Sequence, residues 1–108
     1  MSEPFDVVAI IEPKPGKADR VEELLLNAAA SVKANEPGTL RYHLQRQTNT
    51  KTPVFVLLET YKDKKSLGVH AASKDFKKLG EALKTEDLLS SPMKVYLTKE
   101  VGGFASKL

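Results

Sequence analysis

The sequence predicts an α+β fold of the ferredoxin-like type, with elements in the order β-α-β-β-α-β. Two short segments, residues 5–12 and 54–61, have apolar residues in both alternating sets, as in central strands covered on both faces. Two longer segments carry apolar residues at helical spacing, and a third short segment alternates between apolar and polar residues. The chain of 108 residues is the size of one domain, which we place at residues 1–101, followed by a flexible tail at 102–108.

The first strand and helix follow from residues 5–38. Residues 5–12 form a strand, which Pro13, Pro15 and Gly16 end before a helix begins. The helix is indicated by apolar residues three and four apart: Val21, Leu24, Leu25, Ala28 and Val32. The run Asn35-Glu36-Pro37-Gly38 ends it.

Residues 39–47 form the second predicted strand, and its two faces differ. Leu40, Tyr42 and Leu44 are expected on one face, which looks toward the helices. Arg41, His43 and Gln45 are expected on the other. One polar face indicates a strand near the edge of the sheet.

The second half of the chain repeats the pattern of strand and helix. Residues 54–61 form the third strand, and Asp63 is a suitable amino-terminal cap for the helix that follows. This helix carries His70 and is expected to break near Ser73. It then continues with Phe76, Leu79, Ala82 and Leu83 at helical spacing. A connection at 88–92 leads to a last strand at 93–101.

The topology places the first and third strands at the centre of the sheet, which agrees with their apolar faces. The two helices cover one face of this sheet. The other face is also apolar, and no element of the chain remains to cover it. A second copy would cover it economically, so we expect a homodimer whose sheets pack face to face.

Composition excludes several classes of function. The chain has no cysteine, which rules out disulfides, iron–sulfur clusters and thiolate nucleophiles. It has no apolar run long enough to span a membrane. The net charge of +3 is too modest to indicate nucleic-acid binding, and the lysines after residue 61 are better explained as the solvated face of a helix.

Three motifs resemble the antibiotic biosynthesis monooxygenase domain family over residues 7–101. The main one is E-x-Y-x-D-x-x-x-L-x-x-H-x-x-x-x-x-F, formed by Glu59, Tyr61, Asp63, Leu67, His70 and Phe76. Upstream, Pro15-Gly16-Lys17 and the run from Glu36 to Tyr42 are similar to the family's helix start and its turn into the second strand. The resemblance implies a dimeric α+β barrel with a pocket in each subunit, between the sheet and the helices. It also implies oxygenation without metal or flavin, so no cofactor is expected.

The chain departs from the family pattern in two respects. Many members have a second histidine just before the phenylalanine, where this chain has Asp75. The tryptophan of haem-degrading relatives is absent, because the chain has no tryptophan at all. The family also includes isomerases and members without a known reaction, so the fold alone does not decide the function.

His70 is the first candidate for a catalytic residue. A histidine accepts a proton near neutral pH, and oxygenation without a cofactor needs a base that converts the substrate into an electron-rich anion. The alternative is a core histidine satisfied by a hydrogen bond. The other predicted pocket residues are Asn27, Tyr42, Glu59, Tyr61 and Phe76. Each also has a structural reading: Glu59 as a partner of His70 or of a lysine, the tyrosines and Phe76 as core residues, and Asn27 as a solvent-edge residue.

His43 is expected at the surface or at the dimer interface. An iron site made of two histidines and Glu59 is improbable, because the usual H-x-D/E pair is missing. No phosphate-binding loop occurs.

The last three residues, Ser106, Lys107 and Leu108, match the address read by the peroxisomal import receptor. Gly102 and Gly103 precede them and loosen the backbone. The alternative is a surface tail without a targeting role, in a protein that stays in the cytoplasm.

The sequence thus predicts a dimeric peroxisomal oxygenase that acts on a lipophilic or aromatic small molecule, such as a polyketide or an oxylipin. Two other functions stay open: a barrel without catalytic activity that binds a metabolite or serves in stress response, and an isomerase of the same fold.

Overall fold

The computed structural model describes residues 3–107, so Leu108 of the predicted targeting tripeptide lies outside the described residues. Four strands and three helices follow one another in the predicted order. They are β1 (Phe5–Ile11), α1 (Ala18–Asn35), β2 (Thr39–Arg46), β3 (Phe55–Tyr61), α2 (Lys64–Ala72), α3 (Lys74–Thr85) and β4 (Lys94–Thr98). None of the helices in this part of the chain is both long and apolar enough to cross a membrane.

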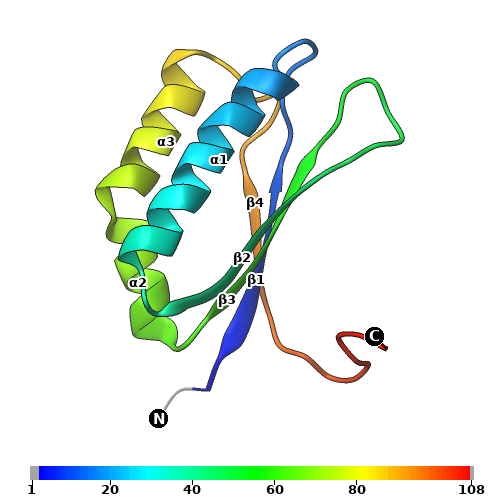
Figure 1. Cartoon of the computed structure of the whole chain (residues 1–108). Coiled ribbons are helices and arrows are strands. Elements are labelled where there is room, and N and C mark those ends of the chain that lie inside the picture. The colour runs from blue at the N-terminus through cyan, green and yellow to red at the C-terminus, as the bar shows by residue number, and fades with distance from the viewer. Residues whose placement is uncertain (1–2, 108) are drawn as a thin grey trace.

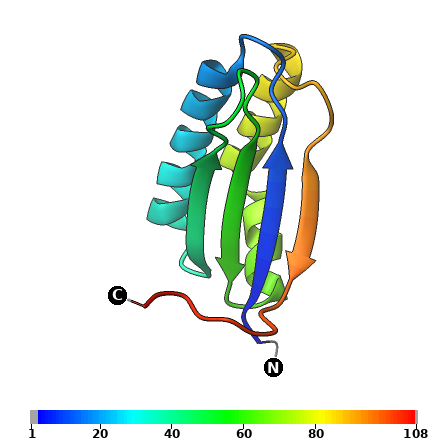
Figure 2. The ribbon, with the colours of Figure 1, turned by 90° about the vertical axis from the view of Figure 1, so that its right-hand side faces the viewer.

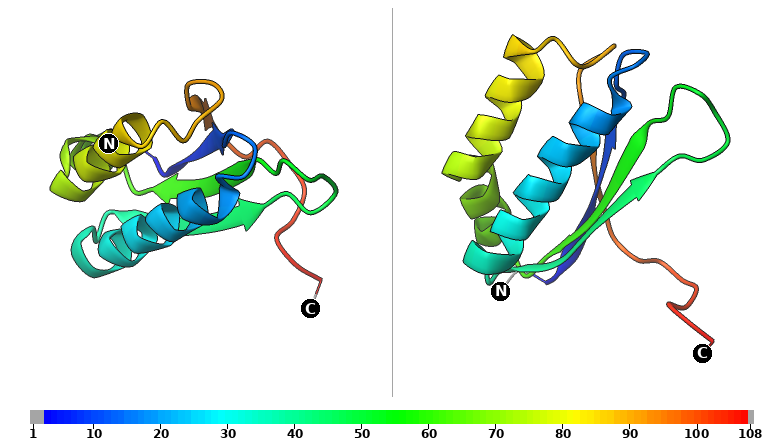
Figure 3. Two further views of the ribbon diagram at one scale, coloured as in Figure 1. Left: turned by 90° about the horizontal axis from the view of Figure 1, so that it is seen from above. Right: turned by 45° about the horizontal axis from the view of Figure 1, so that its top comes forward.

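The strands form one antiparallel sheet in the order β2-β3-β1-β4. The prediction that the first and third strands are central is therefore confirmed. All three helices lie on one face of the sheet, and α1 runs beside α3 (Figure 1). Figure 2 looks onto the opposite face, where the four strands lie in front of the helices and residues after β4 run past the ends of the strands. In Figure 3 this tail leaves the body of the domain.

The core lies between the sheet and the helices. Ile11 and Phe55 are fully buried in the sheet, and they face Val21 and Leu25 of α1. Leu79 and Leu83 of α3 complete the same cluster. The alternation of buried residues along β1 and β3 follows from the two-residue period of a strand, which sends every second side chain toward the helices.

The predicted cap and helix break are confirmed. The Asp63 side chain accepts a hydrogen bond from the backbone N–H of Ser66 at the start of α2. The Ser73 side chain accepts one from the backbone N–H of Phe76 at the start of α3. Because Ser73 has extended backbone angles, the predicted second helix is divided into two, and both parts can face the sheet.

Two details of the prediction are wrong. The pairing of β2 with β3 shifts register between Thr39 and Arg41, so Leu40 is an extra residue and remains 56% exposed. It therefore does not share the helix-facing side with Tyr42 and Leu44. The last strand is shorter than expected, because β4 ends at Thr98 and the following residues have no regular structure.

Gly38 lies where the turn before β2 touches the first turn of α2. A Cβ at this position would overlap Ser66 Oγ, which donates a hydrogen bond to Asp63. We expect Gly38→Ala to destabilise the protein by about 1–3 kcal/mol, because the clash falls on the cap of α2. Gly68→Ala is the matched control, since a Cβ there would have nothing within 4 Å and alanine favours a helix. Urea unfolding of both variants measures the difference; equal stabilities would contradict the contact.

Candidate active site

A cavity of about 220 Å³ lies between the sheet and the two short helices α2 and α3. Most of its wall is apolar. The sheet contributes Val7, Ala9 and Leu57, and the helices contribute Leu67, Phe76 and Leu79. Three polar side chains share this wall, namely Tyr42, Glu59 and His70. An apolar cavity with a few convergent polar groups is the usual form of a small-molecule site.

His70 is held in place by a carboxylate and by aromatic rings. It lies in the last turn of α2 and is 5% exposed. Its Nδ1 is 2.8 Å from Oε1 of Glu36. The ring centroids of Tyr42, Tyr61 and Phe76 lie 5.6, 5.7 and 5.0 Å from that of His70. These contacts restrict the imidazole to one orientation.

The other ring nitrogen, Nε2, has no hydrogen-bond partner among residues 3–107. In the same part of the chain, no fully buried side-chain polar atom lacks a partner. Nε2 is therefore not fully buried, and His70 lines the cavity. Glu36 fixes one ring nitrogen, and the other is available for contact with a ligand.

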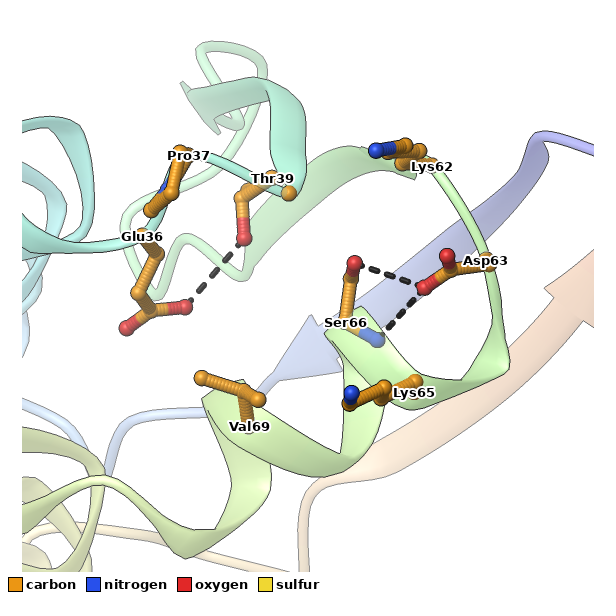
Figure 4. Close-up of a pocket in the computed structure, with 9 residues that line it drawn as sticks. Glu36, Pro37, Thr39, Lys62, Asp63, Lys65, Ser66 and Val69 are labelled. Atoms are coloured by element: carbon orange, nitrogen blue, oxygen red, sulfur yellow. Dashed lines mark hydrogen bonds between the residues drawn. The ribbon is translucent and has the colours of Figure 1, made fainter.

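Glu36 is a residue of the candidate site that the sequence analysis did not name as one. It is the carboxy-terminal cap of α1 and is 8% exposed, and its Oε1 also accepts a hydrogen bond of 3.2 Å from Thr39 Oγ1. Figure 4 shows Glu36 and Thr39 across a surface groove from Ser66 and Val69 of α2. The sequence placed Glu36 in the turn that ends the first helix and in the motif that resembles the family's turn into the second strand, but neither indicated a partner. Its pairing with His70 joins residues that are 34 positions apart.

Glu59 pairs with Tyr61 instead of orienting His70. The Tyr61 hydroxyl donates a hydrogen bond of 2.5 Å to Oε1 of Glu59, and both residues are buried. Burial raises the pKa of Glu59, although the Tyr61 hydrogen bond and nearby His70 oppose this shift. Burial also raises the pKa of Tyr42 and of Tyr61 well above the ordinary phenol value, so both phenols are neutral.

The structure brings together most of the predicted site residues. Tyr42, Glu59, His70 and Phe76 line one cavity, and Tyr61 lies behind it as the partner of Glu59. Asn27 does not belong to this group, because it is exposed on α1 and does not line the cavity. It lies on the solvent side of a helix whose buried face is formed by leucine, valine and alanine.

The two histidines do not share a site. His43 is exposed on β2 and alternates with Tyr42 and Leu44, which pack toward the core, so it projects from the opposite face of the sheet. No cluster of three or more histidine, cysteine or acidic side chains suited to a metal ion occurs among the described residues. Asp75, at the position of the family's second histidine, accepts a hydrogen bond from Ser31 Oγ of α1.

The raised pKa of Glu59 predicts a pH dependence of stability. A carboxyl whose pKa is higher in the folded state binds more protons when folded, so its stabilising contribution is present at low pH. That contribution is lost as the pH rises from the ordinary value of 4.5 through the folded-state pKa. Tyr61, His70, Tyr42 and Glu36 surround the group. We expect the stability of Glu59→Gln relative to the parent protein to increase with pH across this window, as measured by urea unfolding. A constant difference would contradict a perturbed Glu59.

Comparison with known proteins agrees with the geometry. Residues 4–82 match the family model described as antibiotic biosynthesis monooxygenase. No functionally curated protein matches the chain.

Several solved structures share the fold over nearly the whole chain. A Caulobacter crescentus protein assigned to the antibiotic biosynthesis monooxygenases is 32% identical, with a TM-score of 0.83 and coverage of 94% of this chain and 92% of that one. A Pseudomonas aeruginosa protein is 25% identical, with a TM-score of 0.82 and coverage of 94% and 98%. A Mycobacterium tuberculosis protein is 21% identical, with a TM-score of 0.81 and coverage of 95% and 100%, and this likeness concerns the fold alone.

Proposed function

Because this chain belongs to the antibiotic biosynthesis monooxygenase family, we propose that it is a cofactor-independent monooxygenase acting on a lipophilic or aromatic small molecule. The observation that carries the proposal is the pair of His70 and Glu36 at the wall of an apolar cavity. A base with one nitrogen fixed and the other facing a largely apolar space is what proton removal from such a substrate requires.

The pair determines which nitrogen acts as the base. An ionised carboxylate only accepts hydrogen bonds, so Glu36 places the ring proton on Nδ1. Nε2 is then the basic nitrogen, and it takes a proton from an acidic C–H or O–H of the substrate. Glu36 stabilises the imidazolium that forms, as the carboxylate does in other paired acid–base sites. The electron pair of the broken bond stays on the substrate as a carbanion or phenolate.

The anion supplies the electrons for the reaction with oxygen. An activated methylene, R–CH2–R′, that loses one proton and gains O2 forms the hydroperoxide R–CH(OOH)–R′ once the proton returns. Loss of water from the hydroperoxide gives the ketone R–CO–R′. One O2 is consumed and one water is released, so no external reductant is needed. The apolar wall keeps bulk water away from the anion.

The cavity size limits the substrate. Its volume of about 220 Å³ lies below the roughly 300–1,000 Å³ typical of sites for drug-sized ligands. We therefore propose a substrate with one or two rings, or a short lipid chain.

Oxygen consumption tests the proposed function. Purified protein is supplied with one- and two-ring phenols and ketones, and O2 uptake is recorded together with incorporation of labelled oxygen into product. We expect one O2 per product without hydrogen peroxide, and a loss of turnover on the order of 10²–10⁴-fold in His70→Gln. Uptake that is unchanged in His70→Gln would exclude His70 as the base. Binding of these compounds without any uptake would favour a metabolite-binding barrel.

We also propose that the protein works as a homodimer. The fold of this family is commonly dimeric. Four apolar residues lie on the sheet face opposite the helices and are only half-buried in one chain: Val8, Ile10, Val56 and Leu58. A second copy on this face would remove them from water. A native mass spectrum is expected to give twice the chain mass of 11.9 kDa, and Leu58→Lys is expected to give monomers. A monomeric parent protein would overturn the proposal.

The tail is proposed as a peroxisomal address. Ser106 and Lys107 are exposed, and no strand or helix includes them. An import receptor needs an accessible tripeptide. Residues 99–108 fused to the end of a fluorescent protein are expected to move it into peroxisomes, whereas the same fusion with one alanine added after Leu108 is expected to stay in the cytosol. Diffuse fluorescence from both fusions would contradict the address.

A further inference from the structure

We infer that Glu59 and Tyr42 form a pair of neutral hydrogen-bond donors that binds the carbonyl oxygen of the substrate while His70 removes a proton from the neighbouring carbon. The substrate class is then a small ketone with an acidic α-C–H, or its enol or phenol tautomer. This inference rests on the proposed role of His70 as a base, but it does not require the step with oxygen.

The first support is the placement of the three polar groups. Tyr42, Glu59 and His70 are the polar members of a wall that is otherwise apolar. Tyr42 comes from edge strand β2, Glu59 from central strand β3 and His70 from α2, so the two donors lie on the sheet and the base lies on a helix. A planar ligand between the sheet and α2 can therefore present its oxygen to the sheet and its α-carbon to His70.

The second support is the hydrogen-bond inventory. Oε1 of Glu59 accepts from Tyr61, and Oε2 has no partner among the described residues. The Tyr42 hydroxyl likewise has no partner there. Because no fully buried side-chain polar atom in that region lacks a partner, both atoms are at least partly accessible. Glu59 lines the cavity, and Tyr42 lines both the cavity and a neighbouring groove beside α1. Both atoms are therefore available for a hydrogen bond with a ligand.

The third support is the protonation state that the surroundings favour. Tyr61 donates to Oε1, so a proton on Glu59 belongs on Oε2 and can be donated into the cavity. Burial raises the pKa of Glu59 and the pKa of Tyr42, and each shift favours the neutral donor form. Two neutral donors stabilise the developing negative charge of an enolate better than they stabilise the carbonyl oxygen of the bound ketone.

The proton balance of the step is simple. The α-C–H bond breaks, the proton moves to Nε2 of His70, and the electron pair forms the C=C bond of the enolate. The carbonyl oxygen gains the negative charge and holds its two hydrogen bonds without taking either proton. Return of the proton to carbon restores the ketone, whereas attack of the enolate on O2 begins the oxygenation.

The test uses α-proton exchange under anaerobic conditions. The protein is incubated with 2-tetralone in D2O, and loss of the α-proton signals is followed by NMR against buffer alone. Glu59→Gln keeps an acceptor for Tyr61 and an N–H donor for the ligand. Glu59→Leu combined with Tyr61→Phe removes the donor without leaving a buried group unpaired. Glu81→Gln, on the exposed side of α3, is the matched control.

We expect the exchange rate of Glu59→Gln to stay within about tenfold of the parent rate. The exchange rate of the parent protein should fall as rising pH ionises Glu59, and that of Glu59→Gln should not. The double variant is expected to lose on the order of 10²–10³-fold, the usual effect of removing one such donor. Tyr42→Phe removes the other donor and is expected to lose exchange on a similar order. Melting temperatures show whether each variant is folded.

Several results would overturn the inference. One is the absence of exchange in the parent protein, and another is full activity in the double variant. A third is a loss in Glu59→Gln as large as in the double variant, since this result would make Glu59 itself the base. The oxygen assay separates this inference from the proposed function. Exchange without O2 uptake would support the enolate site and reject the monooxygenase. O2 uptake on other compounds without exchange would support the monooxygenase and reject the enolate site.

Discussion

Replacing Glu36 with alanine is expected to destabilise the protein by about 1–3 kcal/mol and to remove most of its activity. The stability loss arises because Nδ1 of His70 stays buried without its partner at 2.8 Å. The activity loss arises because the ring proton is no longer held on Nδ1, so Nε2 is not reliably the basic nitrogen. The decrease in turnover should be on the order of 10²–10⁴-fold, as for a general base that has lost its position.

The measurement combines unfolding with spectroscopy, so that positioning is separated from folding. The nitrogen chemical shifts of the imidazole are expected to show one tautomer in the parent protein and a mixture in Glu36→Ala. Glu36→Gln should restore part of the activity, because its amide oxygen can still accept from Nδ1. Glu23→Ala is the control: this exposed acid on the same helix pairs with Arg20, and its loss should cost less than about 1 kcal/mol. A single tautomer in Glu36→Ala would contradict the positioning role.

Phe55→Ala is expected to have the largest effect on stability, about 3–5 kcal/mol. Phe55 begins β3, is fully buried, and packs in the cluster that joins the sheet to α1 and α3. Its replacement leaves a cavity that the central strand cannot close by itself. Since small domains are stable by roughly 5–15 kcal/mol, the variant should unfold at a much lower temperature.

Phe104→Ala is the matched control for this prediction. Phe104 lies in the tail and is 71% exposed, and the Lys107 ammonium lies 5.7 Å from the centre of its ring. Its loss should change the free energy of unfolding by no more than about 0.5 kcal/mol. Guanidinium unfolding at one fixed protein concentration compares the two variants, because a dimer makes the midpoint depend on concentration. Equal effects would show that Phe55 does not contribute to the core as described.

The sheet and its strand order could be predicted because the pattern of apolar and polar residues along each strand indicates whether that strand is central or at an edge. Apolar residues on both faces of β1 and β3 indicate central strands, and the polar face of β2 indicates an edge. Asp63 and Ser73 indicate where α2 and α3 begin through their own side chains. The orientation of Leu40 was predicted wrongly because a bulge depends on how two strands pair. The alternation of residues along a single strand does not indicate that pairing.

The site was harder to predict because its contacts join distant segments. His70 and Phe76 were identifiable from the motif that resembles the family's, and both line the cavity. Glu36 looked like part of a turn, since nothing in the run Glu36-Pro37-Gly38 indicates which way its carboxylate lies. Asn27 looked like a pocket residue among apolar neighbours, but the helix has an exposed side at this position.

The hydrogen bond between Glu36 and His70 also means that the candidate site forms only when the whole domain has folded. Glu36 ends the first helix, and His70 lies 34 residues later in another helix, so the pair exists only after both have docked on the sheet. Before that point His70 is an ordinary solvated histidine without a fixed tautomer. In the proposed mechanism, a nascent or partly unfolded chain is therefore inert, and reactive anions are generated only by molecules that have completed folding.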